Sequence, residues 1–239
     1  MKTKIIVCLT LFCLFSLTLT SPTLAKAKNI ARGVFINYTK AKSKKPGGSP
    51  ATDMNATYKY SGIHWTNPNV SYVVDASLSG IMPADAITAV NAGFDTWENE
   101  INPFGFADKS IIDYTYNLSA PATSGTPALD GQNTISWGSL GSGTIAATYY
   151  WYTRKGKVLV EFDMIFNKNM PWSSSGENSK FDIHNIAAHE AGHTLVLNDL
   201  YLSSNRELTM YGYGAMGETK KRDLGYGDML GVERIYPVR

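Results

Sequence analysis

Apolar residues recur at helical spacing in two stretches of the chain. The first begins at Pro83, a residue well suited to the first turn of a helix, and is predicted to end near residue 101. One face of this helix carries the apolar side chains of Ile87, Val90, Phe94, Trp97 and Ile101. The second stretch follows Asp182, a good N-cap residue, and predicts a helix over about 183–195.

Short runs rich in β-branched and aromatic residues predict strands around these helices. The expected strands cover residues 69–75, 111–117, 133–137, 145–152 and 157–166. A polar, glycine-containing turn at 153–156 would join the last two as a hairpin. This mixture indicates an α+β fold, and about 210 residues beyond the first segment can form one domain with a substantial core.

The first 25 residues have the pattern of a secretory signal peptide. Two lysines precede an apolar run from residue 5 to 19, which is too short for a comfortable membrane span. Small residues then predict cleavage after residue 25 or 27. Both cysteines, Cys8 and Cys13, would leave with this segment. We therefore expect a secreted, extracellular protein without disulfides and without a membrane span in its mature form.

Charge is distributed unevenly along the rest of the chain. Residues 26–45 contain seven basic residues and no acidic residue, whereas the residues that follow contain 13 basic and 20 acidic residues. We interpret residues 26–60 as a basic N-terminal arm, which could be a pro-segment across an acidic body, a surface tether or a solvated tail. The net charge without the signal peptide is about zero, and we expect no nucleic-acid partner.

The second predicted helix carries the strongest chemical signal. His189 and His193 are four residues apart, which on a helix corresponds to about 40° of rotation and about 6 Å of rise. Two imidazoles on one helix face can bind a single metal ion, and Glu190 could hold a water molecule beside that ion. The alternative is two histidines of the core or the surface that have this spacing by chance.

This H-E-x-x-H arrangement resembles that of the metzincin zinc proteases. Their third ligand stands ten residues after the first histidine, where this chain has Asp199, as in the snapalysin branch. The family usually has glycine three residues after the second histidine, and this chain has Val196 there. Because a straight helix would carry Asp199 away from the metal, we expect a turn with Val196 at positive φ; the alternative is a turn at Asn198.

Two further features resemble the matrixins among the metzincins. Met210, within the segment 209–213, fits the tight turn beneath the metal, and Met216 is a weaker rival for that place. Residues 224–236 look like the closing helix of the matrixins. In all, the resemblance covers residues 64–236.

The resemblance implies a zincin-like catalytic domain over residues 61–239. We expect a twisted, mixed five-stranded sheet, an active-site helix and a small C-terminal subdomain. An edge strand above the cleft would bind an extended peptide through its backbone, and the residues of this strand include Glu161, Phe162 and Asp163.

The expected cofactor is one catalytic zinc ion on His189, His193 and Asp199, with Glu190 as general base. A second, structural zinc is not expected, because the matching strands contain no histidine. Calcium at Asp163 or other carboxylates has no recognisable binding loop in support.

We therefore interpret the sequence as that of a secreted, monomeric zinc-dependent endopeptidase that acts on peptide or protein substrates. Two alternatives stay open at this point. One is an exported binding protein on a degenerate metzincin fold, and the other is a zinc hydrolase of a non-protein substrate. The intact Glu190 argues against the first.

Overall fold

The structure, a computed structural model, describes residues 29–39, 54–119 and 125–238. The expected signal peptide and its cleavage positions lie outside the described residues, as do residues 40–53 of the basic arm. None of the helices in the described ranges is both long and apolar enough to cross a membrane.

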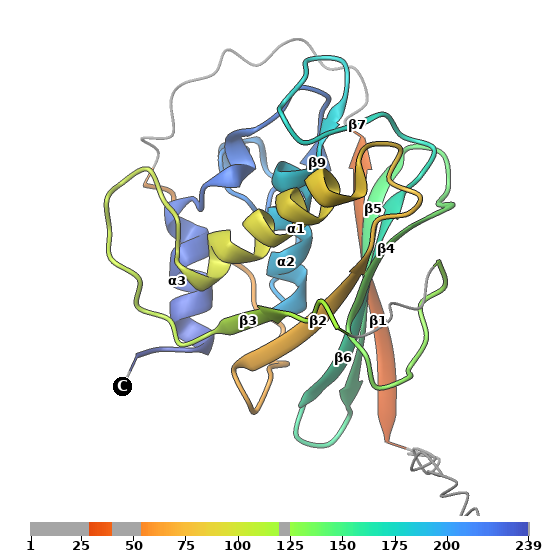
Figure 1. Ribbon diagram of the computed structural model, residues 1–239. Helices are drawn as coiled ribbons and strands as arrows, with labels where there is room; N and C mark the ends of the chain where they lie inside the picture. The colour runs from red at the N-terminus through yellow and green to blue at the C-terminus, as the bar shows by residue number, and fades with distance from the viewer. Residues whose placement is uncertain (1–28, 40–53, 120–124, 239) are drawn as a thin grey trace, which may run out of the picture.

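One sheet dominates the fold (Figure 1). Its strand order is β3-β2-β4-β6-β5-β1-β9, with bounds β1 (Ile30–Thr39), β2 (Asn69–Asp75), β3 (Asp113–Tyr116), β4 (Thr134–Gly138), β5 (Thr144–Thr153), β6 (Leu159–Asn167) and β9 (Tyr213–Gly214). The neighbouring strands β3, β2, β4 and β6 run parallel to one another, whereas β5 is antiparallel to both β6 and β1. Two short strands, β7 (Trp172–Ser173) and β8 (Phe181–Asp182), form a separate pair.

The prediction of a mixed sheet is confirmed, but the number of strands was wrong. The five predicted strands are adjacent in the sheet, and the hairpin of β5 and β6 around residues 153–156 is present. The sheet nevertheless has seven strands in the described residues, because β1 and β9 extend it beyond β5. Both additions come from segments that the hydrophobic pattern did not indicate as strands.

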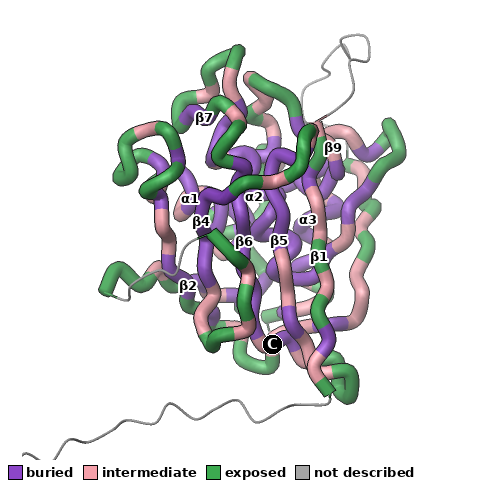
Figure 2. Tube along the Cα trace, turned by 90° about the vertical axis from the view of Figure 1, so that its right-hand side faces the viewer, coloured by how far each residue is buried: buried purple, intermediate pink, exposed green. Residues whose placement is uncertain are grey.

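The edge position predicted for Glu161, Phe162 and Asp163 is wrong. These residues belong to β6, which lies between β4 and β5 in the interior of the sheet. All three are buried, and the pattern in Figure 2 shows buried positions running along β6 and its neighbours. Strand β6 is thus paired on both sides and cannot accept a substrate peptide.

The carboxylates of Glu161 and Asp163 have a structural role instead. Glu161 accepts hydrogen bonds from the backbone N–H groups of Asp130 and Gly131, at 2.9 and 2.6 Å. Asp163 accepts from the backbone N–H group of Ala128 in the same loop and from that of Thr134 at the start of β4. The two carboxylates therefore hold the loop before β4. Among the described residues, neither carboxylate belongs to a cluster of side chains that could bind a metal ion.

Two helices, α1 (Pro83–Glu98) and α2 (Ile183–Thr194), cover one face of the sheet (Figure 1). They approach closely because Gly93 on α1 faces Ala187 on α2, where a Cβ on the glycine would overlap the alanine. The Trp97 indole N–H also donates to the carbonyl of Ala188 over 2.6 Å. Helix α1 thereby fixes the position of α2 against the sheet.

The predicted helix bounds hold at three of the four ends. Helix α2 begins after Asp182, whose Oδ1 accepts from the N–H of Asn185 at 2.9 Å, so the predicted N-cap is confirmed. Helix α1 ends at Glu98 rather than near residue 101, because Glu100 adopts a positive φ of 41°. Ile101 consequently lies outside the apolar stripe and is exposed.

The chain beyond α2 forms the side of the molecule away from the sheet (Figure 1). It contains two short 3₁₀ helices, η1 (Ser203–Asn205) and η2 (Lys220–Arg222), and closes with α3 (Tyr226–Ile235). The predicted closing helix is therefore present, one turn shorter than its predicted range. Between η1 and η2 the chain returns to the sheet as β9.

Candidate metal centre

The two histidines of α2 are fully buried, and each ring is fixed by a backbone carbonyl. Nδ1 of His189 lies 2.7 Å from the carbonyl oxygen of Thr209, and Nδ1 of His193 lies 2.8 Å from that of Leu197. Because a carbonyl oxygen only accepts hydrogen bonds, both Nδ1 atoms must carry the proton. In the neutral ring, each Nε2 atom then has a free lone pair, which is the form that binds a metal ion.

A sharp turn brings Asp199 back to these rings. Helix α2 ends at Thr194, and Val196 adopts a φ of 56°, as predicted from the spacing. The side chain of Val196 is fully buried and packs in a small cluster with Ile63 and Leu159, which holds the residue in this unfavourable conformation. Strain at the turn is thus offset by burial of the same side chain.

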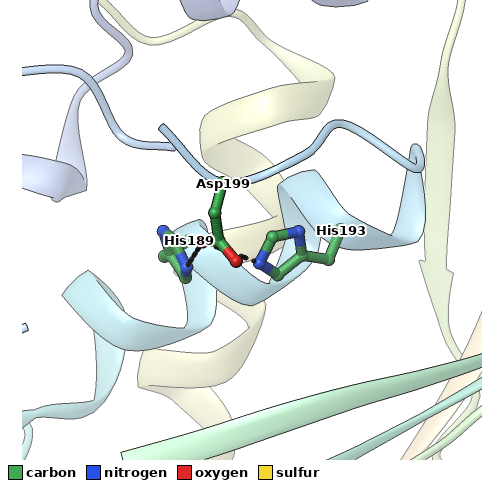
Figure 3. A group of neighbouring side chains, drawn as sticks. All are labelled: His189, His193 and Asp199. Carbon is green, nitrogen blue, oxygen red and sulfur yellow. Dashed lines mark ion pairs between the residues drawn. The ribbon is translucent and has the colours of Figure 1, made fainter. Parts of the chain in front are cut away.

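The three side chains converge on one point (Figure 3). Oδ1 of Asp199 lies 3.2 Å from Nε2 of His189 and 3.4 Å from Nε2 of His193. In a tetrahedral zinc site with bonds of about 2.0–2.1 Å, neighbouring ligand atoms are about 3.3–3.4 Å apart. Within the described part of the chain, this is the group of His, Cys, Asp and Glu side chains with the geometry to hold a metal ion.

Unpartnered polar atoms provide an independent test of the fit. Nε2 of His189, Nε2 of His193, Oδ1 of Asp199 and Oε1 of Glu190 are all buried without a hydrogen-bond partner. Buried polar atoms are normally paired, because each unpaired atom costs about 1–3 kcal/mol. Two nitrogens and one oxygen that face a common point fit a zinc ion with three protein ligands.

Electrostatics favours a neutral His189 and an ionised Asp199, whereas the Asp199 and Glu190 carboxylates raise the pKa of His193 against the effect of its burial. Burial lowers the pKa of His189 to about 4, and the nearby Lys221 ammonium acts in the same direction, so this imidazole is neutral. Burial would raise the pKa of Asp199, but the adjacent His193 and His189 rings outweigh burial and hold this pKa below its usual range. The centre therefore presents neutral His189 and ionised Asp199.

Glu190 lies beside the three potential ligands but is held by the sheet. Its Oε2 accepts a hydrogen bond from the hydroxyl group of Thr148 on β5 at 2.6 Å. Its Oε1 has no partner, and burial raises the pKa of this carboxyl to about 7. Glu190 is thus positioned with one oxygen bound and the other free.

Met210 lies directly against the helix that carries the histidines. A side chain on Gly192 would overlap the sulfur of Met210 and the ring of Trp97, so only glycine permits this approach. Met216, the rival for this place, is 47% exposed, whereas Met210 is 1% exposed. The geometry therefore favours Met210 for the turn beneath the site.

The sequence analysis did not identify several residues that support this centre. Asp228 on α3 accepts hydrogen bonds from the N–H groups of Thr209 and Met210, at 2.6 and 3.1 Å, and so anchors the methionine turn. The Tyr201 hydroxyl donates to Oδ2 of Asp199 at 3.1 Å. Lys221, fully buried, donates to the carbonyl of residue 213 at 3.0 Å. In the sequence, nothing except their polar character indicated that these three residues support the site.

Comparison with known proteins agrees with this geometry. The sequence profile of the matrixin family matches residues 64–237. This chain belongs to the matrixin family. Matrixins are zinc metallopeptidases, so the family and the converging side chains point to the same kind of centre. No curated protein sequence matches the chain. Strand β1 lies before the matched residues.

Proposed function

We propose that this matrixin is an exported zinc-dependent endopeptidase, with Glu190 as general base and His189, His193 and Asp199 as zinc ligands. The observation that supports this proposal most strongly is the convergence of three unpartnered ligand atoms beside a carboxylate that also has a free oxygen. Export rests on the signal-peptide pattern of the first 25 residues.

Each residue has a distinct part in the proposed reaction. When bound, zinc supplies Lewis acidity, which acidifies a coordinated water and polarises the carbonyl group of the scissile peptide bond. Glu190 accepts the proton of the attacking water on Oε1 and passes it to the leaving amine. Thr148 holds Oε2 of Glu190, so that Oε1 stays directed toward the reacting atoms.

Asp199 makes the site more negative than a third histidine would. This extra charge disfavours ionisation of the water, and the hydrogen bond from Tyr201 to Oδ2 offsets part of that effect. The Thr148–Glu190 hydrogen bond holds one oxygen of the buried carboxylate and leaves the other without a partner, an arrangement that suits a general base better than a binding protein. We therefore favour a peptidase over a binding protein.

Zinc content and casein cleavage test the proposal directly. We expect purified protein to contain about one zinc ion per chain, to cleave casein, to lose activity with a chelator and to regain it with zinc. Zinc-loaded protein that leaves casein and a mixed peptide library intact would instead support the hydrolase of a non-protein substrate. Protein that binds no zinc would contradict the ligand assignment.

A further inference from the structure

Lys221 is buried behind the metal centre. It belongs to the short helix η2, and its side chain is fully buried. Lysine is rarely buried completely unless a carboxylate pairs with it. In the described part of the chain, however, no carboxylate forms an ion pair with this side chain. A buried lysine without a carboxylate partner needs another reason for its place in the core.

The amine of Lys221 binds two backbone carbonyl groups instead. Nζ donates to the carbonyl oxygens of Tyr211 and Tyr213, over 2.5 and 3.0 Å. A lysine side chain carries at least two N–H groups in either protonation state, so both bonds form whether or not the amine is charged. One edge of the segment 211–213 is thus held by a side chain, where a sheet would have a neighbouring strand.

The opposite edge of this segment is paired with the residue that follows a proposed ligand. Leu200, the neighbour of Asp199, donates to the carbonyl of Met210 at 2.9 Å and accepts from the N–H of Gly212 at 3.0 Å. Gly212 also lies against the ligand itself, because a Cβ at this position would come within 2.9 Å of Oδ1 of Asp199. The position of the segment 211–213 therefore sets the position of the Asp199 carboxylate.

Lys221 is in turn anchored to the helix that carries the two histidines. Its backbone N–H donates to Oδ1 of Asn185 at 2.9 Å, one turn before His189 on α2. Next to it, the Arg222 guanidinium binds both carboxylate oxygens of the N-cap Asp182, at 2.9 and 2.6 Å. Nζ of Lys221 also lies 3.5 Å from Nδ1 of His189. One side chain thus connects α2 with the segment that lies against the third ligand.

We propose that Lys221 is a positioning residue, which sets the distance between the two parts of the chain that supply the metal ligands, α2 and the turn to Asp199. The connection runs from α2 through Nζ to the segment 211–213, and from Gly212 to the carboxylate. This inference rests on the proposed function for the role of the three ligands. Without the amine, two carbonyl groups would lose their donor, so the segment would move to find other partners and the ligand would move with it.

Hydrogen exchange tests this connection in the absence of metal. Lys221→Met keeps the apolar stem of the side chain and removes its N–H groups. In zinc-free protein, we expect amide exchange in residues 210–214 to become at least about tenfold faster, while residues 145–152 keep the exchange rates of the parent. Lys220→Met is the matched control, because this neighbouring lysine of η2 is partly exposed and should leave both segments unchanged. Equal exchange in residues 210–214 of Lys221→Met and of the parent would overturn the proposal.

Zinc affinity tests the consequence for the metal centre. In a competition titration with a chelating dye, Lys221→Met should bind zinc about 10–100-fold more weakly than the parent, as is typical when an outer partner of a metal ligand is lost.

A core variant separates this effect from a general loss of stability. Ile135 is fully buried on β4, which β6 separates from β5. Ile135→Ala should be less stable in urea and yet retain the zinc affinity of the parent. An equal loss of zinc affinity in Ile135→Ala and Lys221→Met would make Lys221 an ordinary core residue and overturn the proposal.

Chemical restoration of the amine tests whether its N–H groups are responsible. The chain for this experiment carries Cys8→Ser, Cys13→Ser and Lys221→Cys, so that one thiol remains. In the unfolded protein its thiolate displaces bromide from 2-bromoethylamine, which gives a side chain of the length of lysine with sulfur in place of one methylene group. After refolding, this protein should regain slow exchange and tight zinc binding. The same chain alkylated with 1-bromopropane should behave like Lys221→Met, and equal results with both reagents would overturn the proposal.

These experiments separate the positioning role from the proposed function. Faster exchange in Lys221→Met, together with a parent that binds no zinc, would support the connection through Lys221 and contradict the ligand assignment. A parent that binds zinc and cleaves casein, together with a Lys221→Met variant of unchanged exchange and zinc affinity, would contradict the connection and leave the peptidase function intact.

Discussion

The hydroxyl group of Thr148 donates a 2.6 Å hydrogen bond to Oε2 of Glu190, which ties the sheet to the helix at the centre of the site. Both residues are fully buried, so water does not compete for this contact. The proposed base is therefore oriented by a residue of β5 rather than by its own helix. This arrangement makes the position of Glu190 sensitive to changes in the sheet.

Replacement of Thr148 should therefore affect the turnover rate more than metal binding. We expect Thr148→Val to retain zinc and to lower kcat by about 10–100-fold with little change in KM, because Glu190 loses its orienting donor. Thr148→Ser keeps the hydroxyl group and should restore most of kcat. An unchanged kcat in the valine variant would show that the bond does not position the base.

Replacement of the base itself should have a larger effect. Glu190→Ala should keep its zinc and lose hydrolysis by about 10²–10⁴-fold, since proton transfer from the attacking water loses its acceptor. Glu190→Gln, which conserves shape, should be about as inactive as the alanine variant. Activity equal to that of the parent would remove Glu190 from the mechanism.

Tyr201 provides a test of Asp199 as a ligand. Tyr201→Phe removes the donor that orients the Asp199 carboxylate, and should weaken zinc binding by about 10–100-fold in a competition titration with a chelating dye. Tyr213→Phe is the matched control, because this ring packs edge-on against Tyr201 with centroids 5.3 Å apart. Identical zinc affinities in both variants would argue against a ligand role for Asp199.

The turn at Val196 predicts an unusual order of stability. Val196→Ala loses buried contacts and keeps the positive φ, whereas Val196→Gly loses slightly more but relieves about 1–2 kcal/mol of backbone strain. Both variants should be less stable than the parent, with glycine at least as stable as alanine in urea unfolding. In ordinary helices and strands a glycine variant is less stable than an alanine variant by about 0.5–1 kcal/mol. If Val196→Gly were likewise less stable than Val196→Ala, the backbone at this turn would carry no significant strain.

Glu100 predicts a pH dependence of stability remote from the metal centre. Burial raises the pKa of this carboxyl to about 8 from an ordinary value of 4.5, and the nearby Asp108 and Glu233 act in the same direction. The folded chain thus binds this proton more tightly than the unfolded chain does. The resulting stabilisation is complete below about pH 4.5 and is lost as the pH rises through about 8.

Glu100→Gln should therefore flatten the pH profile of stability. Its thermal midpoint should fall less than that of the parent between about pH 5 and about pH 8, at one zinc concentration throughout. The glutamine keeps an acceptor for the N–H of Lys109, which lies 3.1 Å from Oε1 in the parent. Parallel profiles for the two proteins would show that Glu100 does not titrate in this range.

Local signals made much of the fold predictable. The N-cap at Asp182, the apolar stripe of α1 and the spacing around Val196 each depend on a few neighbouring residues, and the structure shows each of them. The internal position of β6 also had a signal, since six of the eight residues 159–166 are apolar and three of them are consecutive at its end. Such a run is typical of a strand that is buried on both faces.

Long-range contacts could not be predicted in the same way. Thr148 and Asp228 reach the site from segments distant in sequence, and each is an ordinary polar residue until the chain is folded. Strand β1 was missed for a different reason. The basic charge of its surroundings suggested an arm, although β-branched and aromatic residues cluster at 34–38.

The hydrogen bonds of Asp228 bear on the order of events when the protein is made. Asp228 anchors Thr209, whose carbonyl oxygen fixes the ring of His189. The histidines leave the ribosome well before α3, so the nascent chain lacks this anchor while they are already available to bind ions. The shape of the metal centre therefore depends on the last helix, and a chain that stalls before α3 is expected to hold a metal ion less tightly.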